Sequence, residues 1–256
     1  MGASSAGAIV SVTPTPNPIA VTEASSGTWS VDVNTYITTD DPIEGLAGIF
    51  LPKVETRDEV LRWDAAVAAV ETARSIPVNA TRLVLSLESA LGVLNAHAMS
   101  VAAPRVASLS FGGAQDGDLN TDLGCTWSSD GPEMMTARGM ALIAARAARF
   151  DSPLDGVFAD VRNPDGFERD TALSRRLGYR GRKLIHPSQI EPCNRLYAPN
   201  QRELDYYARV LEAFDKALTQ GHASTTVDGK MIDVAMANAA RRVLHGAKAL
   251  APPRKS

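Results

Sequence analysis

The feature that most constrains this chain is a repeated unit: a short apolar run, then polar residues, then a helical pattern. The apolar runs occupy residues 46–51, 83–87, 106–111 and 154–158, and one more lies within 181–190. This alternation is typical of βα units in a parallel sheet. Because successive parallel strands end on one face, we expect the polar residues after them to gather there. Those that carry chemistry are Lys53, Glu55, Glu88, Asp116, Asp118, Asp160 and His186.

Length and composition limit the classes of protein that fit. A β/α barrel needs about 250 residues, and this chain has 256, of which 45% are hydrophobic. The formal net charge is -3 with mixed signs, which argues against nucleic-acid binding through a basic patch. We see no apolar stretch near the roughly 20 residues of a membrane span and no secretory signal. We therefore expect a cytoplasmic protein with no membrane contact.

The chain is predicted to have three parts. Residues 1–30 are rich in Ser, Thr and Pro, with Glu23 as the only ionised side chain, and we interpret them as an atypical N-terminal arm. A β/α barrel domain follows over 31–218, and residues 219–256 form a lid segment with a final helix. Strands are also expected at 7–12 and 29–33, and helices at 58–74, 133–150, 166–177, 201–218 and 234–248.

Two acidic side chains at neighbouring strand ends indicate a metal site. Glu88 follows one strand, and Asp116 or Asp118 follows the next. Mg²⁺ favours one or two carboxylates together with waters and substrate oxygens. Gly112 and Gly113 precede the aspartates, and glycines let a ligand approach the backbone closely. The competing interpretation is that each acid caps a helix or lies in a solvated loop.

The remaining strand-end residues have weaker signals. A lone histidine such as His186 is more often structural than catalytic. Lys53 and Glu55 could pair with each other or support a neighbouring site. From the residues alone, the hypothesis is a metal-dependent barrel enzyme that acts on an oxygen-rich small molecule.

Several motifs in this order resemble the citrate lyase β-subunit family, within the HpcH/HpaI aldolase superfamily that includes malyl-CoA and citramalyl-CoA lyases. The similarity runs over about residues 45–250. It rests on LPKVE at 51–55, LESALG at 87–92, FG at 111–112, Asp118-Leu119 with DLG at 122–124, LDGV at 154–157, IHPSQI at 185–190 and DGKMID at 228–233.

The resemblance implies a TIM-like (β/α)8 barrel derivative that binds Mg²⁺ through Glu88 and Asp118, with Asp116 as the alternative. It implies a carbon–carbon lyase for a 3-hydroxyacyl-CoA such as citryl-, malyl- or citramalyl-CoA, or a thioesterase on the same scaffold. The C-terminal segment would deliver Asp233 as the acid/base group to a neighbouring subunit of a homo-oligomer, a trimer or hexamer. We assign substrate binding to Lys53, Glu55, Gly112, Gly113 and His186.

The N-terminal part departs from the family pattern. Members open with a strand carrying an arginine and a strand ending in Leu-Glu-Asp, and neither motif occurs here. Val31-Asp32-Val33-Asn34 stands where Val-Arg-Val-Asn is usual. The sequence therefore predicts a barrel that lacks the usual first two βα units, with six strands from Trp29 onward. Either residues 1–30 fill the gap, or a partner chain fills it, or the chain is an impaired or non-catalytic truncated homologue.

Overall fold

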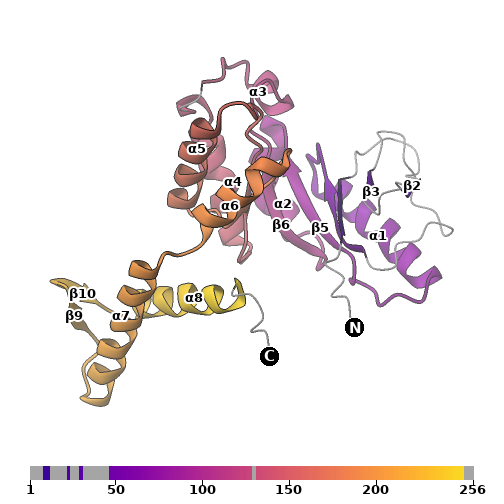
Figure 1. Ribbon diagram of the computed structural model, residues 1–256. Helices are drawn as coiled ribbons and strands as arrows, with labels where there is room; N and C mark the ends of the chain where they lie inside the picture. The colour runs from indigo at the N-terminus through magenta and orange to yellow at the C-terminus, as the bar shows by residue number, and fades with distance from the viewer. Residues whose placement is uncertain (1–7, 12–21, 24–28, 31–45, 129–130, 251–256) are drawn as a thin grey trace, which may run out of the picture. The chain divides into compact units, whose positions relative to one another are not determined.

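The computed structural model describes residues 8–11, 22–23, 29–30, 46–128 and 131–250. The chain forms two compact units, Met1–Cys193 and Asn194–Ser256. The first unit carries the parallel sheet and its helices, and the second carries a helical pair with a hairpin (Figure 1).

A parallel sheet is the framework of the first unit. Its described strands are all paired in parallel. This sheet, with helices between its strands, confirms the predicted α/β fold class, a TIM-like barrel derivative. In spatial order the strands are β1 (Ala8–Ser11), β4 (Leu46–Leu51), β5 (Arg82–Leu87), β6 (Val106–Phe111), β7 (Leu154–Asp155) and β8 (Gly181–Arg182).

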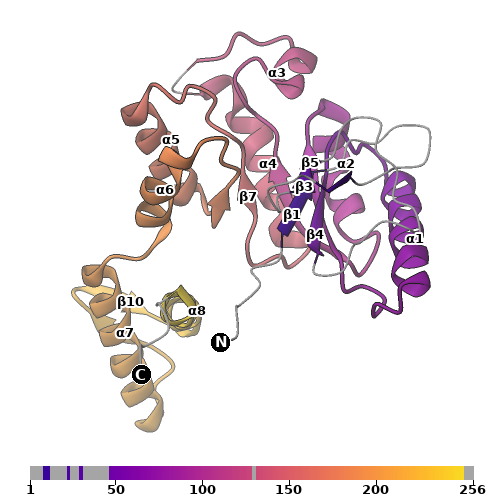
Figure 2. The same ribbon diagram turned by 45° about the vertical axis from the view of Figure 1, so that its right-hand side comes forward.

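The helices follow the predicted pattern closely. In α1 (Arg57–Ala73), Val60, Trp63, Val67 and Val70 are buried, as their helical spacing predicts. Helices α2 (Ala90–Ser100) and α4 (Met135–Ala147) pack against each other and against β6 (Figure 2). The other elements of this region are α3 (Asp118–Leu123), α5 (Pro164–Leu177), α6 (Ile190–Tyr197) and the 3₁₀ turns η1 (Pro132–Met134) and η2 (Pro187–Gln189).

The predicted strand at 154–158 is shorter than expected, because side chains bind the backbone groups beyond Asp155. The N–H of Gly156 donates to Asp155 Oδ1 at 2.9 Å. Its carbonyl accepts from Nε and Nη2 of Arg182 at 3.1 and 2.9 Å. Gly156 is therefore held by side chains, and β7 ends at Asp155 instead of continuing to residue 158.

The described part of the predicted strand at 29–33 lies in a separate small sheet. There β3 (Trp29–Ser30) pairs antiparallel with β2 (Thr22–Glu23). Residues 31–33 fall outside the described residues, as does the segment compared with Val-Arg-Val-Asn. The expected strand at 7–12 is confirmed as β1, which pairs with β4.

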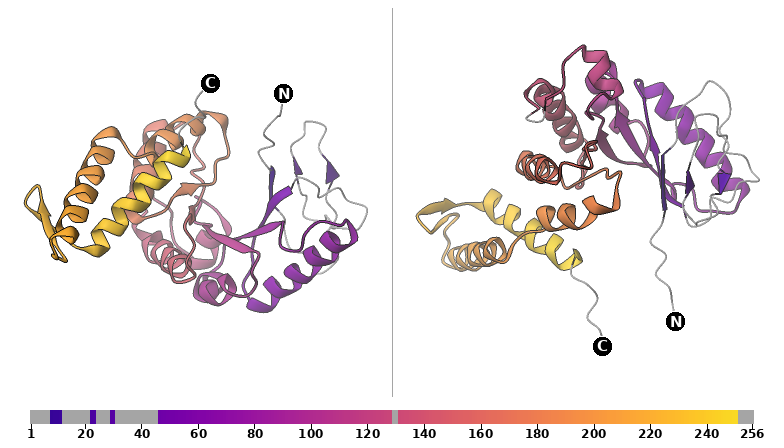
Figure 3. Two further views of the ribbon diagram at one scale, coloured as in Figure 1. Left: turned by 90° about the horizontal axis from the view of Figure 1, so that it is seen from below. Right: turned by 45° about the horizontal axis from the view of Figure 1, so that its top comes forward.

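The second unit begins at Asn194 within α6, and its main elements are α7 (Gln201–Thr219), a hairpin and α8 (Val234–Leu250) (Figure 3). Strands β9 (Thr225–Val227) and β10 (Lys230–Ile232) pair antiparallel. Asp228 and Gly229 connect them with φ of 51° and 76°, as the two-residue turns that suit hairpins require. The core of this unit includes Val210, Phe214, Val227, Ile232, Ala237 and Ala240. The function of residues 219–256 as a lid stays a prediction.

None of the helices described over 46–128 and 131–250 combines the length and the apolar character that a membrane span needs.

Candidate functional site

Glu88 leaves the sheet at the end of β5 and lies against the end of β6. Leu87 pairs with Phe111, and the N–H of Gly112 donates to the Leu87 carbonyl at 2.9 Å. A Cβ at Gly112 would lie 2.5 Å from Glu88 Cγ and 2.4 Å from the Leu87 carbonyl oxygen. Gly112 is therefore required for this placement of the Glu88 side chain, which remains 17% exposed.

Lys183, which the sequence analysis did not single out, faces Glu88. Its Nζ lies 3.7 Å from Glu88 Oε1 and donates to Ser86 Oγ at 2.8 Å. Burial lowers the pKa of Lys183 below its usual value, and the Glu88 carboxylate opposes this shift. The only signal in the sequence is a lysine that directly follows a strand residue within the 181–190 run.

Asp118 and Lys53 form an ion pair near this region. Asp118 is the first residue of α3, and its Oδ2 lies 3.0 Å from Lys53 Nζ, with both side chains more than half exposed. In the same helix, Asp122 Oδ2 accepts from the N–H of Ala90 at 2.6 Å. This contact ties α3 to the start of α2, two residues beyond Glu88.

The acidic residues suit Mg²⁺ by their chemistry. Within 46–128 and 131–250, no group of three or more His, Cys, Asp or Glu side chains could hold a metal ion. Mg²⁺, however, needs only one or two carboxylates because waters and substrate oxygens complete its shell. Glu88 and Asp118 are accessible hard-oxygen donors, so the residues fit such an ion. Asp116 lies in the preceding turn with φ of 55°.

Other predicted site residues have structural contacts of their own. The Glu55 carbonyl accepts from Asn95 Nδ2 at 2.8 Å. Asp160 Oδ1 accepts from the N–H of Arg162 at 3.1 Å. The exposed His186 places Nδ1 2.8 Å from Ser188 Oγ and caps η2. These contacts explain the local conformations, and the substrate-binding roles of Glu55 and His186 stay predictions.

Gly113, also predicted to bind substrate, is confined by Phe111. A Cβ at this position would lie 2.2 Å from Phe111 Cε1. The aromatic ring therefore packs directly on the backbone that follows β6, and a larger residue would displace it.

Asp233 lies in the second unit, between β10 and α8. Its Oδ1 accepts from the N–H of Met236 at 3.0 Å, which is the hydrogen bond of a helix N-cap. The side chain is partly exposed.

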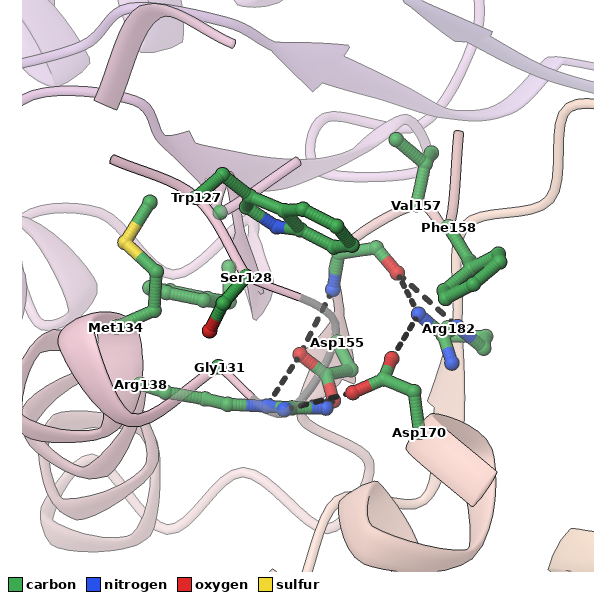
Figure 4. A pocket seen from close by; sticks show the side chains of 13 residues that line it. Trp127, Ser128, Gly131, Met134, Arg138, Asp155, Val157, Phe158, Asp170 and Arg182 are labelled. Atoms are coloured by element: carbon green, nitrogen blue, oxygen red, sulfur yellow. Dashed lines mark hydrogen bonds and ion pairs between the residues drawn. The ribbon is translucent and has the colours of Figure 1, made fainter. Parts of the chain in front are cut away.

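A buried network of ion pairs fixes the backbone between β7 and β8. The sequence analysis did not predict it. Arg138 binds both Asp155 and Asp170, and Asp170 Oδ2 also lies 2.7 Å from Arg182 Nη2 (Figure 4). Burial opposes the charge on Arg138, but the two aspartates raise its pKa above the usual value. The network lines a cavity of about 30 Å³ with Trp127 and Ser128 among its walls. Since its charges are balanced, we interpret it as a support for the strand ends.

Comparison with known proteins shows the family of this chain. The HpcH/HpaI aldolase/citrate lyase family matches residues 17–187. The citrate lyase subunit beta of Haemophilus influenzae is 33% identical over 204 residues, which cover 80% of this chain and 69% of that protein. A (3S)-malyl-CoA thioesterase of Cereibacter sphaeroides is 31% identical over 216 residues, covering 82% and 70%. The chain therefore belongs to the HpcH/HpaI aldolase/citrate lyase family.

Solved structures share the fold. A citrate lyase from Burkholderia xenovorans superposes with a TM-score of 0.69 and 22% identity, over 84% of this chain and 72% of that one. The CitE protein of Mycobacterium tuberculosis, in complex with magnesium, acetoacetate and coenzyme A, gives a TM-score of 0.59 and 23% identity, over 80% and 71%.

Proposed function

We propose that this chain is a Mg²⁺-dependent carbon–carbon lyase that acts on a 3-hydroxyacyl-CoA thioester of the citryl-, malyl- or citramalyl-CoA type. The observation that carries the proposal is the Glu88 side chain at the end of β5, packed against Gly112 directly after β6, in a chain of this family. The magnesium and coenzyme A in the CitE complex support the same cofactor and substrate class.

Glu88 and Asp118 are the residues that would hold the metal. When bound, Mg²⁺ supplies Lewis acidity to a carbonyl or carboxylate oxygen of the acyl group. Lys53 Nζ pairs with Asp118 Oδ2 at 3.0 Å. With Mg²⁺ bound to Asp118, Lys53 would be free to bind the substrate. Gly112 leaves room for the Glu88 side chain against the backbone.

Asp233 is the proposed general base. It would take the proton of the 3-hydroxyl group. The electron pair of that O–H bond becomes the new carbonyl bond, the adjacent carbon–carbon bond breaks, and its pair passes to the α-carbon of the thioester. A proton then adds to that carbon to give the acyl-CoA product.

Thioester hydrolysis is the second candidate. The (3S)-malyl-CoA thioesterase relative, at 31% identity over 216 residues, is the observation that favours it. The two activities differ in products, because hydrolysis releases free coenzyme A and leaves the carbon skeleton intact. A third possibility, a non-catalytic subunit, rests on the departures of the N-terminal sequence.

A screen of acyl-CoA thioesters tests the proposal. Citryl-, malyl- and citramalyl-CoA are incubated with the wild type and with Glu88→Gln, with Mg²⁺ or with EDTA. We expect the wild type to consume at least one thioester only with Mg²⁺, and the variant to lose that activity. Absence of turnover of all three thioesters by folded, Mg²⁺-bound wild type would refute the enzyme proposal.

Gly112→Ala provides a geometric test of the metal site. The added Cβ, 2.5 Å from Glu88 Cγ, forces the carboxylate to move. Changes beside metal ligands weaken metal binding by roughly 10- to 100-fold, and we expect an effect in that range by isothermal titration with Mg²⁺.

The matched control for Gly112→Ala is Gly139→Ala. A Cβ at Gly139, inside α4, meets no heavy atom within 4 Å. Replacing a helical glycine with alanine stabilises by about 1 kcal/mol or less, and Mg²⁺ affinity should not change. Equal Mg²⁺ affinities for wild type and Gly112→Ala would exclude Glu88 as a ligand of the metal.

A further inference from the structure

Three polar side chains share one face of the sheet beside Glu88. Ser86 of β5 and Ser110 of β6 are paired residues in parallel strands, so their side chains lie on the same face. Glu88, two residues after Ser86, continues that face. Lys183 Nζ reaches it from beyond β8 and donates to Ser86 Oγ at 2.8 Å.

The residue before Lys183 explains why its ammonium points to this face. Successive side chains at a strand end point to opposite sides. Arg182 is bound on the other side by Asp170 and Thr171 of α5, at 2.7 and 2.8 Å. This anchor fixes the backbone so that Lys183 faces Ser86.

The cluster has hydrogen-bonding capacity to spare. An ammonium group has three donors. Among the described residues, the Lys183 ammonium donates to Ser86 Oγ alone, and its Nζ lies 3.7 Å from Glu88 Oε1. Ser110 is fully buried, and its Oγ has no hydrogen-bond partner within the part of the chain that the structure describes. A buried hydroxyl without a partner costs free energy unless a ligand or water satisfies it.

A carboxylate group can accept hydrogen bonds both from the Lys183 ammonium and from the Ser110 hydroxyl. The chain contains no lysine or arginine before Lys53, so its first 52 residues provide no cation for a substrate carboxylate. We propose that Lys183 and Ser110 bind a carboxylate of the organic-acid part of the substrate, an inference that rests on the proposed function.

The alternative is that Lys183 only balances the charge of Glu88. The two roles differ in what Lys183→Met changes. If Lys183 binds the acid, the variant loses acid affinity but keeps Mg²⁺ affinity, because removal of a cation leaves Glu88 free for the metal. If Lys183 only balances charge, acid affinity does not change.

Calorimetric titration separates the roles, with L-malate as the probe. Mg²⁺ is titrated first into the wild type, Lys183→Met and Lys183→Arg, and malate is then titrated at saturating Mg²⁺. A hydrogen bond to a charged group corresponds to roughly a 10- to 100-fold change in affinity. We expect Lys183→Met to weaken malate binding by that factor without weakening Mg²⁺ binding, and Lys183→Arg to lose less. Lys216→Met, which removes an exposed lysine of α7, should match the wild type.

Ser110→Ala tests the hydroxyl. We expect roughly 2- to 10-fold weaker malate binding, with no loss of thermal stability because the hydroxyl without a partner is gone. Unchanged malate affinity in Lys183→Met, or no malate binding to Mg²⁺-loaded wild type, overturns this inference while the lyase proposal stands. Failure of the wild type to bind Mg²⁺ would refute both the proposed function and this inference.

Discussion

Asp233→Asn is expected to lower turnover by about 10²- to 10⁴-fold, the usual contribution of a general base. Asparagine removes the base but keeps an oxygen that can accept the hydrogen bond from the N–H of Met236, now made by Asp233 Oδ1 at 3.0 Å. Asparagine and aspartate are similarly good N-caps, so α8 should stay intact. Steady-state rates, with thermal unfolding and Mg²⁺ titration as controls, check the result. Wild-type turnover in this variant would exclude Asp233 as the base.

Mixing variants tests whether the site is shared between subunits. If Asp233 of one chain serves the metal of another, chains with Asp233→Asn and chains with Glu88→Gln should regain activity together. Mixed assemblies would contain some sites with both intact residues. No recovery, with subunit exchange shown by a mass label, would contradict a shared site and the oligomer that it requires.

Arg105→Met is expected to destabilise the first unit by about 3 to 5 kcal/mol, as when one partner of a buried ion pair is removed. Arg105 and Glu71 are fully buried, with Nη2 of Arg105 3.1 Å from Glu71 Oε2. Arg105 Nε also lies 2.5 Å from Asp64 Oδ1. The variant leaves the Glu71 carboxylate without its cation, and urea unfolding measures the loss.

Two controls sharpen the Arg105 result. Arg62→Met removes an exposed arginine from the same helix as Glu71 and should change stability by about 0.5 kcal/mol or less. The double variant Glu71→Gln with Arg105→Met should recover part of the loss, because no charge remains buried. If the double variant is no more stable than Arg105→Met, the unpaired charge is not the cause.

The same pair predicts how stability depends on pH. Burial would raise the pKa of Glu71, but hydrogen bonds from Arg105 and from the N–H groups of Thr81 and Asn79 lower it below its usual value. The unfolded chain therefore binds more protons just below the usual glutamate pKa of about 4.3, and stability falls as pH decreases through the folded-state pKa. The stability difference between wild type and Arg105→Met should narrow as the buffer becomes more acidic.

The apolar pattern predicts the parts of this fold that depend on local spacing. The buried positions of α1 and the strands β4, β5 and β6 follow from it, as does the placement of Glu88 at a strand end. It does not predict Lys183 or Arg105, because their partners are distant in sequence: Ser86 is 97 residues from Lys183, and Glu71 is 34 from Arg105. A charged residue beside a strand weakens the apolar signal, so these pairs become visible only in three dimensions.

Product analysis tests the central claim most directly. Wild type with Mg²⁺ is incubated with the thioester that it consumes, labelled with ¹³C in the acyl group, and the products are identified by mass spectrometry. The account predicts a shorter acyl-CoA together with an oxo acid that carries the rest of the label, both absent with Glu88→Gln. Free coenzyme A with the intact hydroxy acid would instead show that the chain hydrolyses the thioester and does not break the carbon–carbon bond.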